Sequence, residues 1–135
     1  MKKTVFALAL VCSSFIFAQK SKSYVEISYA SICCGTPSTA PVMTYLSQFQ
    51  KKNKIKSLEI LKQSGLGREG EFNLYIGLDG FSKSQKTSFV KGLETAILKQ
   101  NTARNTSSDG IVNFESSKII TQAEVKNKNL TPLNK

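Results

Sequence analysis

Two short runs of this chain alternate between apolar and polar side chains, and this two-residue period is the strongest constraint on its fold. The first run, residues 24–30, places three apolar side chains on one face: Val25, Ile27 and Tyr29. The second, residues 71–78, places four there: Phe72, Leu74, Ile76 and Leu78. Because successive side chains of a strand point to opposite faces, the period predicts two strands that are each buried on one side. Such strands are typical of an antiparallel sheet.

Two longer runs have helical spacing instead. In the first, Ser38 is a candidate cap, Pro41 falls in the first turn, and the apolar residues recur every three or four positions: Val42, Tyr45, Leu46 and Phe49. The second begins with a capping box of Ser82 and Gln85 and continues to about residue 100, with its apolar stripe at Phe89, Leu93 and Ile97. We therefore expect two amphipathic helices, each covering a sheet with one face.

Two further runs complete the pattern. Residues 55–61 predict a strand with Leu58 and Ile60 toward the core, and residues 110–115 predict a fourth strand. Ile119 and Ile120 either extend the fourth strand or form a separate edge strand. The order strand, helix, strand, strand, helix, strand is that of the split βαβ motif. The sequence thus predicts an α+β fold, a ferredoxin-like βαββαβ sandwich whose antiparallel sheet carries two helices on one face.

The first 18 residues have the pattern of a secretory signal peptide. Lys2 and Lys3 precede an apolar stretch, residues 5–17, that is too short to span a bilayer, and the small residue Ala18 marks the expected cleavage site. We therefore expect an exported protein of the periplasm or the extracellular space, with no transmembrane segment in the mature chain. Residues 19–121 are predicted to form a single α+β domain, and residues 122–135 a polar, flexible C-terminal tail.

The chain is basic. It has 19 Lys and Arg residues against 9 Asp and Glu, and loss of Lys2 and Lys3 with the signal peptide leaves a net charge of +8. Nearly all of the positive charge is on lysine, which favours long-range attraction over bidentate recognition. The expected partners are an anionic envelope component or an acidic protein. Nucleic acid is disfavoured because aromatic residues do not alternate with the basic ones as on a stacking platform.

The residue types disfavour an enzyme. The chain has no histidine, so Ser-His and Cys-His nucleophile pairs are excluded, and the carboxylates do not cluster as an acid and base pair. No catalytic residue is therefore predicted. Residues 65–70 match a Gly-x-Gly-x-x-Gly pattern but lead into an alternating run rather than a helix, which indicates a hairpin loop. Within it, Arg68 is a candidate contact for an anion.

The most unusual feature is a pair of adjacent cysteines, Cys33 and Cys34, in the loop between the first predicted strand and helix. Three states are open in an exported protein: a vicinal disulfide, a bond to another chain, or a dithiol that binds a soft metal such as copper or zinc. Met43 is a further, weaker candidate ligand. A position before a helix N-terminus lowers the pKa of a thiol and makes it more reactive.

This part of the chain resembles the heavy-metal-associated domains of copper- and zinc-handling proteins. Those ferredoxin-like domains carry Met-x-Cys-x-x-Cys between their first strand and first helix, and Cys33 falls at the first cysteine of that motif. The passage Lys-Ile-Lys-Ser-Leu-Glu-Ile, residues 54–60, looks like their entry into the second strand. The resemblance covers residues 24–100. Thr36 and Ser31 replace the second cysteine and the methionine, so only Cys33 carries over, with Cys34 as the substitute ligand.

Two functions follow as expectations. The first is a small exported, non-enzymatic binding protein that depends on a soft metal or on thiol chemistry at the Cys33–Cys34 loop. The second is a basic interaction module for an anionic envelope surface or an acidic protein, in which the two cysteines form a structural vicinal disulfide.

Overall fold

The computed structural model describes residues 21–133, so the predicted signal peptide lies outside the described residues. In chain order the elements are β1 (Ser23–Ala30), α1 (Ala40–Lys52), β2 (Ile60–Gln63), β3 (Phe72–Gly77), α2 (Lys83–Ala103), β4 (Ile111–Phe114), β5 (Ile120–Thr121), α3 (Gln122–Lys126) and β6 (Leu130–Pro132). The predicted α+β class is confirmed. Of the helices in the described part, none is both long and apolar enough to cross a membrane.

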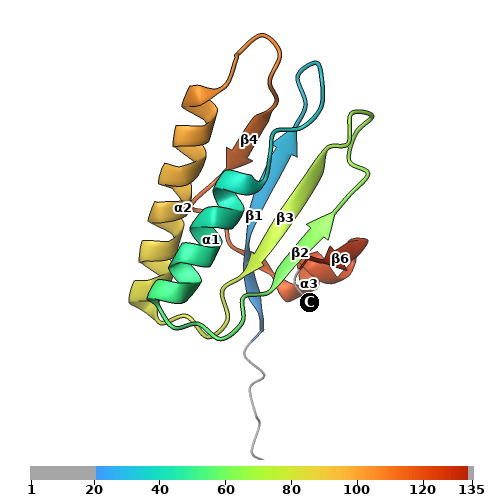
Figure 1. Ribbon diagram of the computed structural model, residues 1–135. Helices are drawn as coiled ribbons and strands as arrows, with labels where there is room; N and C mark the ends of the chain where they lie inside the picture. Colours follow the sequence, from blue (N-terminus) through green and yellow to red (C-terminus); the bar gives the residue numbers. More distant parts are fainter. Residues whose placement is uncertain (1–20, 134–135) are drawn as a thin grey trace, which may run out of the picture.

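The strands form one open antiparallel sheet around β1 (Figure 1). Its order is β4-β1-β3-β2-β6, and β5 pairs with the start of β1. β1 pairs with β3 along most of its length and with β4 through its second half, where Tyr29 lies opposite both Phe72 and Val112. Ile120 therefore belongs to a separate edge strand rather than to an extension of β4.

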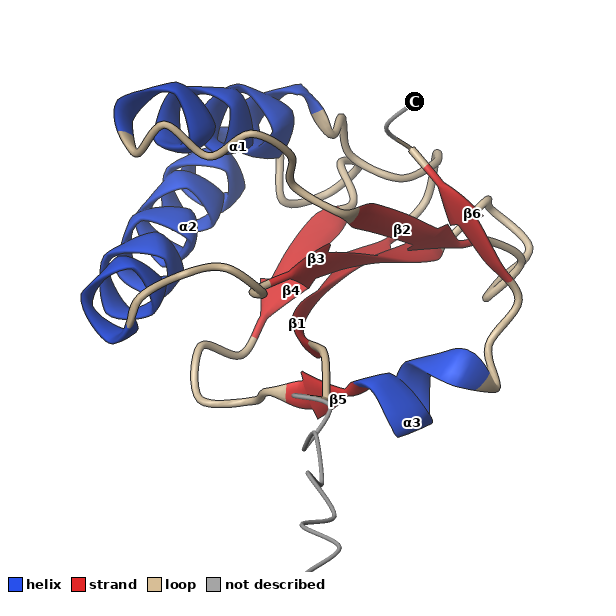
Figure 2. Ribbon diagram, turned by 90° about the horizontal axis from the view of Figure 1, so that it is seen from below, coloured by secondary structure: helices blue, strands red, loops and turns tan. Residues whose placement is uncertain are grey.

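Helices α1 and α2 cover one face of the sheet and bury the main core against it (Figure 2). The alternation in β1 and β3 has the predicted orientation, because Val25, Ile27 and Leu74 are fully buried on this face. Where α1 ends and α2 begins, Phe49 packs on Phe81 and Phe89 with ring centroids 5.0–5.6 Å apart. The capping box predicted at the start of α2 is present.

The opposite face of the sheet carries a second, smaller core that the sequence did not predict. Tyr24, Tyr75, Ile120 and Val125 are buried there together. Val125 comes from α3, which begins with a capping box between Thr121 and Glu124 and lies on the side of the sheet away from α1 and α2 (Figure 2). Tyr75 lies on the face of β3 opposite its predicted apolar side chains, yet it is fully buried in this second core.

The C-terminal segment differs from the prediction. Where we expected a flexible tail over residues 122–135, the chain forms α3 and then β6, which pairs with β2 at the sheet edge. A few apolar side chains, chiefly Val125 and Leu130, fix the segment against the second core. So few apolar residues in a short segment show neither a helical nor a strand repeat. The low apolar content therefore led to the prediction of a flexible tail. The outer boundaries of the domain stay a prediction.

The predicted starts of two elements, β2 and α1, differ from those in the structure. β2 begins at Ile60 rather than at residue 55, because residues 53–59 form the turn that leaves α1 and reaches the sheet. The N-cap of α1 is Thr39, one residue after the predicted Ser38, and Thr39 makes no side-chain capping bond. Ser38 Oγ instead accepts a hydrogen bond of 3.1 Å from the amide of Ala40.

The two long helices run in opposite directions, which gives the molecule two distinct ends (Figure 1). At one end, the start of α1 meets the last turns of α2, where Gln100 Nε2 donates to the carbonyl of Ser38. The β1–α1 loop with its cysteines lies here, and we name this the disulfide end. At the other end, Phe49 of α1 contacts Phe81, just before α2. Most of the lysines of these helices lie here, and we name it the lysine end.

Candidate functional site

Cys33 and Cys34 form a vicinal disulfide in the loop that joins β1 to α1. Both residues are exposed. Gly35 follows them with a φ of 104°, a conformation that favours glycine, and its amide donates a 3.1 Å hydrogen bond to Ser31 Oγ. The loop therefore turns back on itself just beyond the disulfide and leads into the start of α1.

A buried glycine allows this loop to pack against the beginning of β4. Gly110 lies just before β4, and a Cβ atom placed on it would lie 2.6 Å from Pro37 Cδ and 3.0 Å from the carbonyl oxygen of Gly35. The Cβ would lie closer still to the carbonyl oxygen of Ala30, and contacts as short as those to Ala30 and Pro37 do not occur, so only glycine fits here without displacing a neighbour. The sequence analysis did not single out Gly110, because its role depends on a partner loop some 75 residues earlier in the chain.

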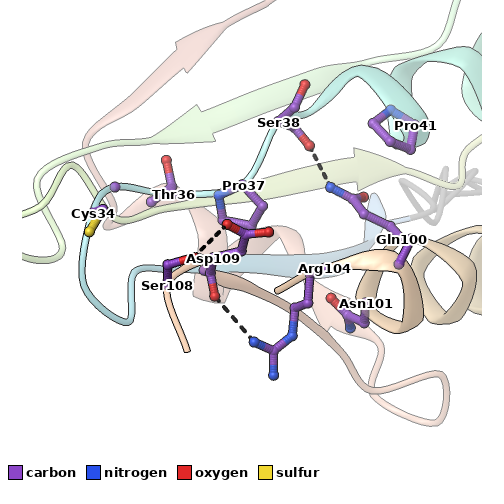
Figure 3. Close-up of a pocket in the computed structure, with 13 residues that line it drawn as sticks. Cys34, Thr36, Pro37, Ser38, Pro41, Gln100, Asn101, Arg104, Ser108 and Asp109 are labelled. Carbon is purple, nitrogen blue, oxygen red and sulfur yellow. Dashed lines mark hydrogen bonds between the residues drawn. The ribbon is translucent and has the colours of Figure 1, made fainter. Parts of the chain in front are cut away.

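The disulfide-end cavity, of about 460 Å³, lies between the β1–α1 loop, the last turns of α2 and the α2–β4 loop (Figure 3). Cys34 forms part of its wall. The prolines at positions 37 and 41 add rigid apolar surface, and more than half of the wall is apolar. Polar side chains come from all three segments: Thr36 and Ser38 from the β1–α1 loop, Gln100 and Asn101 from α2, and Arg104, Ser108 and Asp109 from the segment that follows it.

Two amides of α2 hold the cavity in shape. Gln100 Nε2 donates a 2.7 Å hydrogen bond to the carbonyl of Ser38, whereas its Oε1 is buried and has no partner within residues 21–133. The Asn101 side chain pairs with the backbone of Val112, accepting from its N–H at 3.1 Å and donating to its carbonyl at 2.7 Å. Asn101 therefore occupies the outer edge of β4 as a neighbouring strand would.

The charged groups of the cavity are Arg104 and Asp109. Arg104 Nη1 donates a 3.2 Å hydrogen bond to the backbone carbonyl of Asp109, so the arginine is held by a neutral group. The Asp109 carboxylate accepts from the Asn105 amide at 2.7 Å and from the Ser108 hydroxyl at 3.2 Å. The carboxylate keeps its negative charge but has donors within the loop, whereas Arg104 is the cationic side chain of the wall, and its several N–H donors suit an anion.

The other predicted site residues lie apart from this wall. Met43 lies in α1 and packs against the main core, and Arg68 is exposed in the β2–β3 loop. No cluster of three His, Cys, Asp or Glu side chains occurs within residues 21–133. A disulfide offers no thiolate, and two sulfur atoms are fewer ligands than copper or zinc sites usually require. The side chains at the Cys33–Cys34 loop therefore do not fit a copper or zinc site in this oxidised form.

Three tyrosines have strongly raised pKa values, and burial is the main cause for each of them. Burial raises the pKa of Tyr29, whose hydroxyl is enclosed in the main core without a partner in the described part of the chain. Burial also raises the pKa of Tyr45 to about 12, and its hydroxyl donates to the carbonyl of Phe89. For Tyr24, burial raises the pKa first and a hydrogen bond to Glu59 adds to it. All three remain neutral near neutral pH.

Comparison with known proteins adds no relative: no family model matches the sequence, and no curated protein or solved structure is significantly similar to it.

Proposed function

We propose that this chain is a small exported, non-enzymatic binding protein whose ligand occupies the disulfide-end cavity. The observation that carries the proposal is the cavity itself, which has about 460 Å³ of space beside the vicinal disulfide. This lies within the range of small-molecule sites, which are mostly apolar with a few convergent polar groups. The signal-peptide pattern of residues 1–18 supports the exported location.

The wall indicates the class of ligand. The disulfide and the prolines at positions 37 and 41 offer rigid apolar surface to a flat apolar group. Arg104 offers charged donors to a carboxylate, sulfonate or phosphate. A compact, partly apolar anion meets both requirements.

Metal binding by the two cysteines is the less favoured of the two expected forms of this function. It requires a thiol reductant to open the Cys33–Cys34 bond, giving two protein thiols and an oxidised reductant, before either sulfur can ligate. Ligand binding in the cavity requires no reductant, because Cys34 contributes to the cavity wall in the oxidised state. Binding by the disulfide form is therefore the simpler proposal.

We also infer that the scaffold of this site is a ferredoxin-like core. The order of the first six elements and the sheet order β4-β1-β3-β2 support this assignment. In that view β5, α3 and β6 are additions that cover part of the open face. The ligand site then lies at the end of the core where β1 passes into α1, which is also the position of the motif in the heavy-metal-associated domains that the sequence resembles.

The proposal can be tested with anilinonaphthalene sulfonate, a fluorescent probe that combines apolar rings with an anionic group. Amide chemical shifts recorded during a titration should change most at Gly35, Gln100, Arg104 and Gly110. Arg104→Gln should weaken binding about tenfold, because a charged hydrogen bond to the sulfonate is lost. The matched control is Lys99→Gln, which removes one charge from an exposed position in the last turns of α2, outside the cavity wall.

Two results would contradict the proposal. One is a set of shift changes centred elsewhere, for example on the shallow groove between α2 and Ile119. The other is equal weakening by Arg104→Gln and Lys99→Gln, which would indicate attraction to net charge alone. The thiol-dependent form is tested separately by a Zn²⁺ titration before and after reduction with a phosphine, because only the reduced cysteines supply thiolate ligands.

A further inference from the structure

Six lysines gather at the lysine end, opposite the cavity. They come from the last turn of α1, the loop that follows it and the first turns of α2: Lys51, Lys52, Lys54, Lys56, Lys83 and Lys86. The contact between Phe49 and Phe81, with ring centroids 5.6 Å apart, brings the end of α1 beside the start of α2 (Figure 1). Sequence positions about 30 residues apart thus share one surface.

This surface is not neutralised within the molecule. Within residues 21–133, the ion pairs join Lys22 to Glu59 and Lys118 to Glu26, and none of the six lysines takes part. Five of the six are exposed, and Lys86 is half-buried. Neighbouring like charges repel one another, and an anionic partner would relieve such repulsion.

The backbone at Lys54 gives a second, independent observation. Lys54 follows the C-cap of α1 with a φ of 54°, and no other non-glycine residue in the described part has a positive φ. Around it, the amide of Asn53 donates to Phe49 and that of Ile55 to Gln50, each at 3.0 Å, which closes the helix. Glycine is the usual residue at such a position. The chain therefore keeps a charge where its backbone favours glycine.

We propose that the lysine end docks the protein on an anionic lipid bilayer. Lysine carries a compact, hydrated charge on a flexible stem, which suits a diffuse layer of phosphate headgroups. Protein interfaces, by contrast, are depleted in lysine and enriched in arginine and aromatic residues. Single-stranded nucleic acid requires exposed aromatic rings, yet Phe49 and Phe81 are buried here. This inference is independent of the proposed function, because the cavity lies at the other end.

The test is sedimentation of the exported chain with phosphatidylcholine vesicles, prepared with and without phosphatidylglycerol. We expect binding only to the anionic vesicles and a steep loss with added salt. The variant Lys51→Gln/Lys52→Gln/Lys56→Gln should bind about a hundredfold more weakly. The control, Lys91→Gln/Lys99→Gln/Lys126→Gln, has the same net charge but changes lysines outside the cluster, and it should lose less than about fivefold. Lys54 is left unchanged so that the backbone conformation is not disturbed.

Each contrary outcome overturns the inference. If the native chain does not sediment with anionic vesicles, the lysine end does not bind lipid. If both triple variants weaken binding equally, net charge rather than this surface is responsible. If the lysine-end variant loses binding to soluble polyglutamate but the native chain never binds vesicles, the partner is an acidic protein. Anilinonaphthalene sulfonate binding serves as an internal check, because it should be unchanged by lysine-end substitutions when the cavity proposal holds.

Discussion

The disulfide end and the lysine end of this molecule are built on different physical principles. At the disulfide end, two loops and the last turns of α2 meet through close backbone contact and directed hydrogen bonds, chiefly at Gly110 and Asn101. At the lysine end, exposed cations gather around a buried aromatic cluster, and none of those six lysines forms an ion pair within residues 21–133. One end therefore depends on shape, whereas the other depends on charge.

The difference has a consequence for recognition. A cavity that is held in shape can select a ligand by size and hydrogen bonding, because distorting it costs free energy. A group of flexible lysines has no fixed shape and attracts any extended anionic surface, with a strength that falls as salt is added. The two ends should accordingly respond to opposite treatments: the first to changes in packing, the second to changes in ionic strength.

The largest expected effect is from Gly110→Ala at the disulfide end. The added methyl group would meet the backbone oxygens of Ala30 and Gly35, which cannot move without disturbing β1 and its loop. We expect a loss of about 2 to 3 kcal/mol in the free energy of unfolding, measured by urea denaturation, together with loss of probe binding. Gly67→Ala is the control, because its methyl group would meet only the flexible Glu71 carboxylate. Equal losses in both variants would refute the role of close packing.

The second effect is from Asn101→Ala, which removes both hydrogen bonds to the backbone of Val112. The free energy of unfolding should fall by about 1 to 3 kcal/mol, since the backbone N–H and carbonyl of Val112 both lose a hydrogen-bond partner. The bared edge of β4 should also promote self-association, visible by analytical ultracentrifugation. Thr102→Ala, an exposed neighbour, should change little; a similar loss there would point to a general effect on the helix end.

The smallest effect is a gain in stability at the lysine end. Lys54→Gly relieves the positive φ and lowers the repulsion among the lysines, so the free energy of unfolding should rise by about 0.5 to 1 kcal/mol. The same substitution should weaken vesicle binding, because one charge of the cluster is lost. Lys56→Gly removes a charge where no positive φ is present, and it should not stabilise the chain. A loss of stability in Lys54→Gly would show that this position is not strained.

Local patterns were enough for the main elements. The alternation around Ile27 and Leu74 placed two strands with the correct buried face, and the capping box at Ser82 placed the start of α2. These features depend on neighbours within a few residues, which is the range that sequence patterns report. The second core was missed for the opposite reason, because Tyr75 is buried by Val125 from a segment about 50 residues later.

The candidate site shows the same division. The sequence singled out the adjacent cysteines and left their state open among a disulfide, a link to another chain and a metal-binding dithiol; the structure has the vicinal disulfide. The residues that turn their loop into one wall of a cavity, Gln100, Asn101 and Arg104, looked like an ordinary polar helix end. Their roles arise only when the end of α2 lies beside the β1–α1 loop.

By itself the sequence determined the α+β class, the positions of most strands and helices, the basic charge and the cysteine pair, because each follows from composition or from a short period. The tertiary structure alone decided which segments far apart in the chain meet. It placed Gly110 under the cysteine loop, joined α1 and α2 so that two groups of lysines form one surface, and packed the C-terminal segment against the sheet. The physical reason is that shape and surface charge depend on contacts across the fold, and no local pattern records them.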